Sequence, residues 1–350
     1  MLRAGQPIPT AFLLDPDTLG AVYGAAGRDR AELLSGRAPG RFDPAEFMGS
    51  DACVDGLTDV RVVLSGWGMP RLEPSVLAAL PNLELVLYAA GSVAGFMTDA
   101  AWERGVRVCS ASAINAGPTA EFAAAQVVLG LKGFWGHASA LRGRPSSPAA
   151  LAPDVGVGMH GARVGLVSLG LIGQAVAERL ARTQAEVVAY DPYIDKAKAA
   201  QIGAALVQLP ELFETSRVVS LHTPWLPETE GIVGGALLRS MPQGACLINT
   251  SRGAVVNEPE LIEVARERPD LDFLLDVTHP HEPPLPDSPL YTLPNVWLSP
   301  HIAGSTGSEC QAMGAAMLDE LERWCAGKPL LHELSRGVTQ ASAHASPRSG

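Results

Sequence analysis

The stretch VGLVSLGLIGQAVAERL, residues 164–180, decides the fold. A short apolar run turns at glycines and continues with helical spacing, which is typical of a strand that leads into a helix. A Rossmann corner uses three glycines: one for the tight turn, one for close approach to a pyrophosphate, and one for packing of helix on strand. In this register the three positions are Ser168, Gly170 and Gly173, so the first glycine is replaced.

The next strand-like run favours a dinucleotide site. It ends in Asp191, about 20 positions beyond the corner, where an acidic residue binds the adenosine ribose hydroxyls. A carboxylate there repels a 2′-phosphate, so NAD is favoured over NADP. Without the glycine corner, Asp191 could equally be interpreted as a strand-end aspartate that opens an Asp-Pro turn. We expect Ser168 to cost about 1 kcal/mol if its φ is positive, and almost nothing otherwise. The predicted contacts at this corner are Ser168, Gly170, Leu171, Ile172, Gly173 and Asp191.

Strand-like and helix-like pieces alternate on both sides of the corner, which predicts an α/β protein with parallel sheets. A helix is predicted to begin at Pro118, and a final amphipathic helix covers 308–327. A stretch rich in Pro, Gly and Ser, 143–161, is predicted to be a surface connection. The predicted strands lie within 60–68, 83–92, 106–112, 163–169, 185–191, 217–222, 245–251, 271–277 and 295–301.

Composition excludes several classes of function. A chain of 350 residues is long enough for about two domains. The net charge of −11 makes nucleic acid a poor partner. No apolar run is long enough to span a membrane, and the N-terminus lacks the apolar core of a signal peptide. Five scattered cysteines indicate reduced thiols and a cytoplasmic protein, with no spacing that suggests a metal site.

Two further segments, INTSRGAVVNEPELIEVA (248–265) and LLDVTHPHEPPLPDSPLYTLPNVWLSPHIAGST (274–306), complete a recognisable pattern. Together with the corner they resemble the D-isomer-specific 2-hydroxyacid dehydrogenase family over about residues 50–330. The resemblance implies two Rossmann-like domains: a doubly wound NAD-binding domain, 119–305, inserted into a smaller flavodoxin-like substrate domain, 1–118 plus 306–334. It also implies an active site between them and a homodimer built through the helix after Pro118. Residues 335–350 are predicted to be a disordered tail.

The resemblance implies three catalytic residues. Arg252 would clamp the substrate carboxylate and polarise the adjacent carbonyl, because its guanidinium is a rigid fork of donors. His301 would be the acid/base, and Glu282 the carboxylate that orients it and favours its protonated form. Counted back from DSPLYTLPNV, Glu282 falls on the family position; counted forward from LLDV, His281 does. We favour Glu282 because a proline follows it, but the count alone leaves both open.

Further contacts are implied with less specificity. In the cofactor site, Thr250 and Asp276 would approach the nicotinamide, Asp276 by accepting from its carboxamide. Thr223 would lie in the loop under the adenosine and ribose, and Gly304 would let the chain pass close to the nicotinamide. In the substrate domain, backbone amides of the YAAGSV loop would hold the substrate carboxylate, with contacts at Ala90, Gly91 and Ser92.

These residues lead to one principal hypothesis and one rival. The principal hypothesis is an oxidoreductase that moves a hydride between NAD(H) and C2 of a small 2-hydroxy or 2-keto acid. The rival is a regulatory or scaffolding protein that keeps the fold and binds NAD with little turnover, a reading motivated by Ser168 and the open position of Glu282. Retention of Arg252 and His301 argues against the rival, because a pure sensor needs no acid/base pair.

Overall fold

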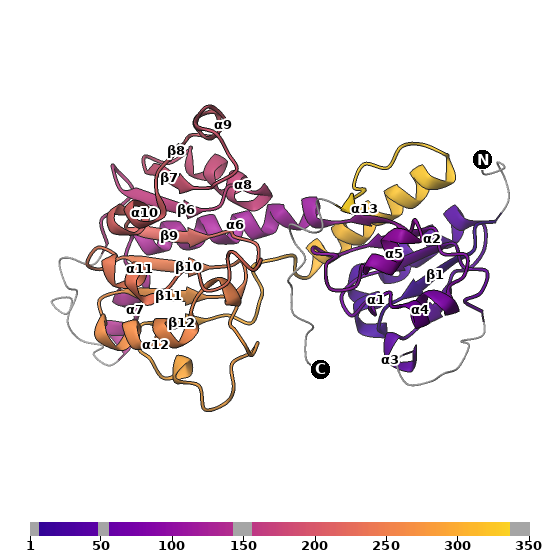
Figure 1. Cartoon of the computed structure of the whole chain (residues 1–350), viewed down its shortest axis with the longest axis horizontal. Helices are drawn as coiled ribbons and strands as arrows, with labels where there is room; N and C mark the ends of the chain where they lie inside the picture. Colours follow the sequence, from indigo (N-terminus) through magenta and orange to yellow (C-terminus); the bar gives the residue numbers. More distant parts are fainter. Residues whose placement is uncertain (1–6, 48–55, 143–155, 337–350) are drawn as a thin grey trace. The chain divides into compact units, whose positions relative to one another are not determined.

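The computed structural model describes residues 7–47, 56–142 and 156–336. These divide into two compact units (Figure 1). One unit contains the described residues up to Asn115 together with those from Ser305 onward, and the other contains Ala116–Gly304. The chain therefore leaves the first unit once and returns to it once.

The first unit is built on a five-stranded sheet in which every neighbouring pair is parallel. Its strand order, β2-β1-β3-β4-β5, is the flavodoxin-like order. The strands are short, and all except the edge strand β2 are almost wholly buried, as expected when helices cover both faces. Their bounds are β1 Thr10–Leu13, β2 Gly40–Phe42, β3 Val62–Ser65, β4 Leu85–Tyr88 and β5 Arg107–Ser110.

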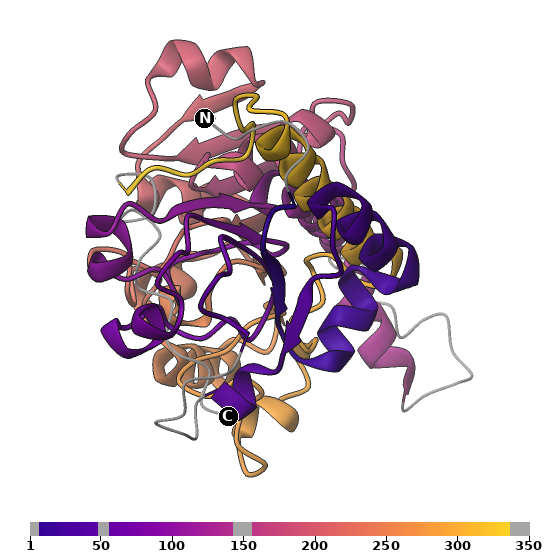
Figure 2. The same cartoon turned by 90° about the vertical axis from the view of Figure 1, so that its right-hand side faces the viewer.

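Helices cover the two faces of this sheet and bury a separate apolar cluster on each. One face carries α1 (Pro16–Val22), α2 (Gly24–Ser35) and the C-terminal helix α13 (Ser308–Cys325), and the other carries α4 (Pro74–Ala79) and α5 (Asp99–Glu103). In Figure 2 the yellow helix α13 lies beside the indigo helices of the N-terminal segment. Arg30 on α2 joins them by ion pairs to Asp319 (2.7 Å) and Glu322 (2.9 Å). The short helix α3 covers Pro44–Phe47.

The second unit is built on a seven-stranded, fully parallel sheet of order β12-β11-β10-β9-β6-β7-β8. This is the doubly wound Rossmann order with one more strand at the edge. The order reverses between β6 and β9, and ligands of such sheets bind outside the carboxyl ends of the strands at that point. The bounds are β6 Arg163–Val167, β7 Glu186–Tyr190, β8 Ala204–Leu206, β9 Val218–Leu221, β10 Cys246–Asn249, β11 Asp272–Leu275 and β12 Val296–Leu298.

Alternate side chains of each strand enter opposite apolar clusters. In β10, Leu247 packs with α10, α11 and α12, whereas Cys246 and Ile248 pack with α6, α8 and α9. This alternation is the period-2 pattern of a strand buried on both faces. The helices are α6 Ser112–Leu131, α7 Phe134–Arg142, α8 Leu171–Leu180, α9 Lys196–Gln201, α10 Leu209–Thr215, α11 Gly235–Ser240 and α12 Glu258–Glu267, with 3-10 turns at Gly253–Val255 and Pro289–Tyr291.

The structure confirms the predicted fold class and corrects one helix boundary. The prediction that a helix begins at Pro118 is wrong, because α6 begins at Ser112 and Pro118 lies inside it. A proline inside a helix removes one backbone hydrogen bond. Burial of the alanine-rich stretch that follows, including Ala120, Ala123 and Val127, stabilises the longer helix despite that loss.

Several expectations fall partly outside the described residues. Of the connection predicted at 143–161, only 156–161 is described, and it is irregular. Of the tail predicted to be disordered, 337–350 lies outside the described ranges, while Arg336 forms an ion pair with Asp99 (2.5 Å). Strands β1, β2 and β8 had no counterpart in the prediction.

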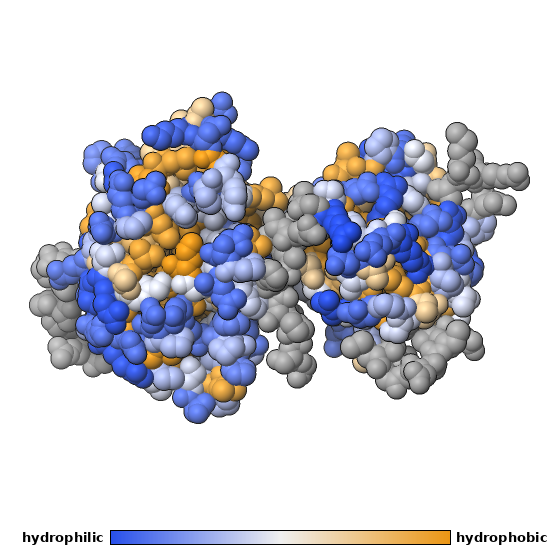
Figure 3. Space-filling view, in the orientation of Figure 1, coloured by the Kyte–Doolittle hydropathy of each residue, from blue (hydrophilic) through white to orange (hydrophobic). Residues whose placement is uncertain are grey.

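On the face drawn in Figure 3, hydrophilic residues surround broad apolar areas over the unit that carries β6–β12. No helix within the described ranges combines the length and the apolarity that a membrane crossing needs. The same residues contain no group of three or more His, Cys, Asp or Glu side chains suited to a metal ion.

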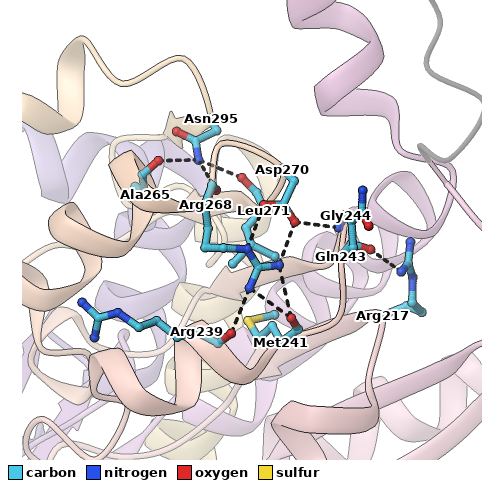
Figure 4. A network of polar contacts seen from close by, with 10 residues as sticks. All are labelled: Arg217, Arg239, Met241, Gln243, Gly244, Ala265, Arg268, Asp270, Leu271 and Asn295. Atoms are coloured by element: carbon cyan, nitrogen blue, oxygen red, sulfur yellow. Dashed lines mark hydrogen bonds and ion pairs between the residues drawn. The ribbon is translucent and has the colours of Figure 1, made fainter.

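A polar network closes the amino edge of the second sheet (Figure 4). Asn295, just before β12, donates from Nδ2 to the carbonyls of Ala265 (3.1 Å), Arg268 (3.2 Å) and Leu271 (2.9 Å). Arg268 forms a two-pronged ion pair with Asp270, whose Oδ2 accepts from the Gly244 amide at 3.1 Å. The end of α12 is thereby joined to the starts of β10, β11 and β12.

We expect Asn295→Ala to lower the free energy of unfolding by about 2 kcal/mol, because buried carbonyls would lose their donor. Chemical denaturation monitored by circular dichroism measures this. Thr292→Ala, a change at an exposed position of the preceding turn, is the control and should leave stability within about 0.5 kcal/mol of the wild type. Equal stability of the two variants would contradict the importance of the Asn295 bonds.

Candidate functional site

Five of the site residues predicted for the second unit lie at the carboxyl edge of its sheet, each one or two residues after the end of a strand. Ser168 follows β6, Asp191 follows β7, Thr223 lies just beyond β9, Thr250 follows β10 and Asp276 follows β11. Because the strands are all parallel, these ends lie at one edge. His301 and Gly304 belong to the segment that leaves β12. The candidate site is therefore a single edge assembled from distant parts of the sequence.

The corner between β6 and α8 has the geometry of an anion site. Gly170 is the N-cap of α8, and no side chain within the described residues caps this helix. A Cβ added at Gly170 would meet nothing within 4 Å, whereas one at Gly173 would lie 2.1 Å from the Ser168 carbonyl oxygen. Gly173 therefore permits close packing of helix and strand. Leu171 and Ile172 supply first-turn amides that face outward with the positive end of the helix dipole.

Ser168 has a positive φ of 75°, in the left-handed region that favours glycine. Its hydroxyl lies 3.0 Å from Thr223 Oγ1, and the Thr223 hydroxyl lies 3.2 Å from the Val167 carbonyl oxygen that accepts from it. The sequence left open whether the φ of Ser168 is positive or negative; it is positive, which is the strained conformation for a residue other than glycine. The hydroxyl pair joins the corner to the loop after β9 and offsets part of the strain.

Asp191 faces the same corner. Its Oδ2 accepts from the Leu169 amide and its Oδ1 from the Tyr193 amide, both at 2.8 Å. An ionised carboxylate has about four acceptor positions. Two therefore remain for hydroxyl donors, and the negative charge is held beside the corner.

Asp276 organises the segment that carries His301. It is 3% exposed, and its Oδ1 accepts from the Ser299 hydroxyl (2.6 Å) and the Ile302 amide (2.9 Å), while Oδ2 accepts from the Ala303 amide (2.9 Å). Its carbonyl accepts from the His301 amide at 2.9 Å. His301 itself has a positive φ of 55°. These bonds hold an unfavourable backbone conformation in place.

His301 and Glu282 lie against each other, with His301 Nδ1 and Glu282 Oε1 2.5 Å apart. Both side chains are about one-third exposed, at 35% and 34%, so the pair is accessible to a ligand. Of the two residues that counting left open, Glu282 is the one in contact with His301. His281 is exposed, and its carbonyl accepts from the Thr278 hydroxyl at 2.7 Å.

Arg252 lies in an extended conformation between β10 and the 3-10 turn. Its guanidinium donates to the Ser251 carbonyl at 2.6 Å, and its own carbonyl accepts from Asn249 Nδ2 at 3.0 Å. A Cβ added at Gly253 would lie 2.1 Å from the Thr278 carbonyl oxygen. The Arg252 segment therefore packs directly against the segment that leads to Glu282.

Two buried polar side chains at this edge have no hydrogen-bond partner among the described residues. One is Thr250, through Oγ1, and the other is His222, through both ring nitrogens. Orphaned polar groups are costly unless a ligand or water satisfies them. Together with the open face of Gly170 and the placement of Asp191, they make this edge fit a dinucleotide.

His222 was not among the predicted site residues. It lies 8% exposed beside Thr223, and burial lowers its pKa from 6.5 to about 4. The only sequence feature that pointed to His222 as a site residue was its position next to Thr223. A lone histidine in an apolar run does not by itself indicate whether the side chain is buried.

Ala90, Gly91 and Ser92 belong to the other unit, where they follow β4 at the carboxyl edge of its own sheet. The Ser110 hydroxyl lies close to the carbonyls of Ala90 (3.0 Å) and Gly91 (2.5 Å). Fixing these carbonyls fixes the direction of the loop's amides. Ala90 is buried, whereas Gly91 and Ser92 are partly exposed.

Comparison with known proteins shows which family the chain resembles. A family model described as D-isomer specific 2-hydroxyacid dehydrogenase, NAD binding domain, matches residues 146–303. A glyoxylate reductase of Korarchaeum cryptofilum is 32% identical over 250 residues, which cover 71% of this chain and 75% of that protein. The chain belongs to the D-isomer-specific 2-hydroxyacid dehydrogenase family.

Other members of the family differ in length. A D-3-phosphoglycerate dehydrogenase of Archaeoglobus fulgidus is 31% identical over 267 residues, which cover 74% of this chain and 49% of that protein. The chain thus spans about half the length of such relatives. The crystal structure of the TT0316 protein of Thermus thermophilus superposes with a TM-score of 0.73 at 26% identity, covering 93% of this chain and 100% of that one. The structural likeness therefore covers residues of both units.

The strain at Ser168 is measurable with two variants. Ser168→Gly and Ser168→Ala both remove the hydroxyl, but only glycine relieves the positive φ. We expect the glycine variant to be more stable than the alanine variant by about 1 kcal/mol, measured by chemical denaturation. We also expect Ser168→Gly to change NADH affinity, measured by fluorescence, by less than about tenfold, since Gly170 and Gly173 are unchanged. A gain well beyond this would mean that Ser168 impairs the site.

His222 should make stability depend on pH. Its pKa in the folded protein, about 4, lies below the ordinary 6.5, so the unfolded chain binds the proton more readily and acid favours unfolding. Between pH 6.5 and 4, the free energy of unfolding of the wild type should fall by about 3 kcal/mol more than that of His222→Leu. Urea denaturation across this range measures the difference. The exposed His160→Asn variant should follow the wild type, and a parallel course for all three proteins would contradict the buried neutral His222.

Proposed function

We propose that the protein is an NAD-dependent oxidoreductase that acts at C2 of a small 2-hydroxy or 2-keto acid. The observation that carries the proposal is the His301–Glu282 contact of 2.5 Å in segments that leave the same sheet edge as the dinucleotide corner. A histidine paired with a carboxylate at an accessible sheet edge is suited to proton transfer. The names of the relatives, D-3-phosphoglycerate dehydrogenase and glyoxylate reductase, point to the same class of substrate.

NAD fits the residues at the carboxyl edge. The first turn of α8 and Gly170 would hold the pyrophosphate, and Asp191 the adenosine ribose. Thr223, Thr250, Asp276 and Gly304 would line the rest of the cofactor site. The charge of Asp191 favours NAD over NADP, because a 2′-phosphate would meet a carboxylate already anchored by two amides.

Each catalytic residue has one task in this reaction. NAD(H), when bound, supplies or accepts the hydride at C2. Arg252 would pair with the substrate carboxylate and draw electron density from the adjacent carbonyl. His301 would donate a proton to the carbonyl oxygen during reduction and take it back during oxidation. Glu282 fixes the imidazole through Nδ1, which leaves Nε2 to face the substrate oxygen.

The remaining assignments follow from the same proposal. Residues 119–305 would bind the cofactor, and 1–118 with 306–334 the substrate, whose carboxylate would meet the amides of Ala90, Gly91 and Ser92. A homodimer would form through α6, the helix that contains Pro118. Two exposed apolar side chains of the next helix α7, Phe134 (46%) and Leu141 (45%), support a further contact. The four cysteines within the described ranges are free thiols, which supports a reducing compartment such as the cytoplasm.

The proposal is tested by mixing purified protein with NADH or NADPH and a panel of 2-keto acids: glyoxylate, pyruvate, hydroxypyruvate, and branched and aromatic keto acids. We expect NADH oxidation with at least one acid and weaker activity with NADPH. NADH binding without oxidation by any acid would overturn the proposal and favour the rival, a regulatory or scaffolding NAD-binding protein.

Glu282 and His281 provide a matched pair of variants. Glu282→Gln removes the charge that holds His301 and should lower kcat by about a hundredfold or more. His281→Ala changes the residue that counting alone could also have placed there, and it should keep kcat within about twofold, since exposed side chains away from the chemistry contribute little. Steady-state kinetics on the best keto acid decides this, and the reverse ranking would assign the position to His281.

A further inference from the structure

Glu258, the first residue of α12, is partly buried and bonded to a residue far along the chain. Its Oε2 accepts from the backbone amide of His279 at 3.0 Å. His279 lies in the segment that leaves β11 and reaches Glu282 three residues later. Burial raises the pKa of the Glu258 carboxyl, opposed by the hydrogen bond from His279. The side chain is therefore withdrawn from water toward this one segment.

Helix α12 does not need Glu258 for its cap. Asn257, the N-cap, accepts from the Glu260 amide at 3.3 Å, and its Nδ2 donates to Glu260 Oε1 at 2.9 Å, so Asn257 and Glu260 hold each other at the start of the helix. Glu260 also accepts from the Gly235 amide on α11. The side-chain cap of this helix end is thus supplied by Asn257, and the Glu258 carboxylate is available to hold His279.

His279 is held on a second side as well. Its ring meets the Trp225 ring edge-on, with centroids 5.1 Å apart, and Trp225 Nε1 donates to Glu230 at 3.0 Å. Beneath it, Gly253 packs against the Thr278 carbonyl. The segment 278–282, which we call the Glu282 segment, has no regular secondary structure of its own. These three contacts, with the Glu282–His301 contact, hold the segment in place.

We propose that Glu258 is a positioning residue, which fixes His279 and thereby holds Glu282 in contact with His301. This inference rests on the proposed function for its catalytic meaning. It assigns Glu258 no contact with substrate or cofactor. Because small displacements of catalytic groups lower rates steeply, loosening the Glu282 segment should lower kcat more than binding.

The test compares Glu258→Ala, Glu258→Gln and Glu263→Ala in the full chain. Alanine removes the acceptor for the His279 amide, glutamine keeps an acceptor oxygen, and Glu263 is an exposed glutamate on the same helix that forms a 3.8 Å ion pair with Arg239. We expect Glu258→Ala to lower kcat by about tenfold to a hundredfold with the KM for NADH unchanged. Glu258→Gln should recover most of that loss, and Glu263→Ala should match the wild type.

Hydrogen–deuterium exchange of the same proteins gives a readout that needs no turnover. In Glu258→Ala, amides of the Glu282 segment should exchange about tenfold faster, and those of Glu258→Gln should stay near the wild type. Unchanged exchange in this segment, or faster exchange confined to α12, would overturn the positioning role. If the wild type turns over no keto acid, the proposed function fails, while the exchange data still decide whether Glu258 holds the segment.

Discussion

The common direction of the strands is the constraint on which the rest of this molecule depends. In the second sheet all neighbouring strands are parallel, so every strand begins at one edge and ends at the other. A side chain that comes directly after any of these strands therefore lies at the same edge as the side chains that follow the other strands. Ser168, Thr223 and Asp276 are far apart in the sequence, yet all three stand at the same edge. Reversing any one strand would remove its residue from the site.

The two edges of this sheet have different tasks. At the amino edge, Asn295 and the Arg268–Asp270 pair satisfy backbone groups and join helix ends to strand starts. At the carboxyl edge, Thr250 and His222 keep polar atoms without partners among the described residues. Buried polar atoms without partners raise the free energy of the fold. A ligand or water bound at the carboxyl edge would remove that cost for Thr250 and His222.

Much of this could be predicted from the sequence, because apolar periodicity, the glycine corner and the acid at Asp191 are local or nearly local signals. The strands around the corner followed from them, whereas the two-unit fold was implied by the family resemblance. The segments β1, β2 and β8 were missed, since short strands at sheet edges or in an unmatched N-terminus have little periodicity. The error at Pro118 arose because proline marks helix starts on average, whereas here the buried alanines after it outweigh its local preference.

Site details were harder for a physical reason. The φ of Ser168 depends on the corner's packing, and the choice between His281 and Glu282 depends on how an irregular segment folds, which counting residues does not determine. The bonds of Glu258 and Asp276 to distant amides leave no periodic trace in the sequence, because each joins two segments that are far apart in the chain.

The packing of Gly253 against the Thr278 carbonyl has a consequence for how such proteins diverge. There is no room for a methyl group between Gly253 and the Thr278 carbonyl. The strand end that carries Arg252 and the loop that carries Glu282 are therefore packed tightly together and should move as one unit. Length changes between Thr278 and Glu282 must bulge outward, toward solvent, because the inner side is closed. Anyone who exchanges loops between relatives to alter substrate choice should transfer 250–258 and 276–282 as a single module.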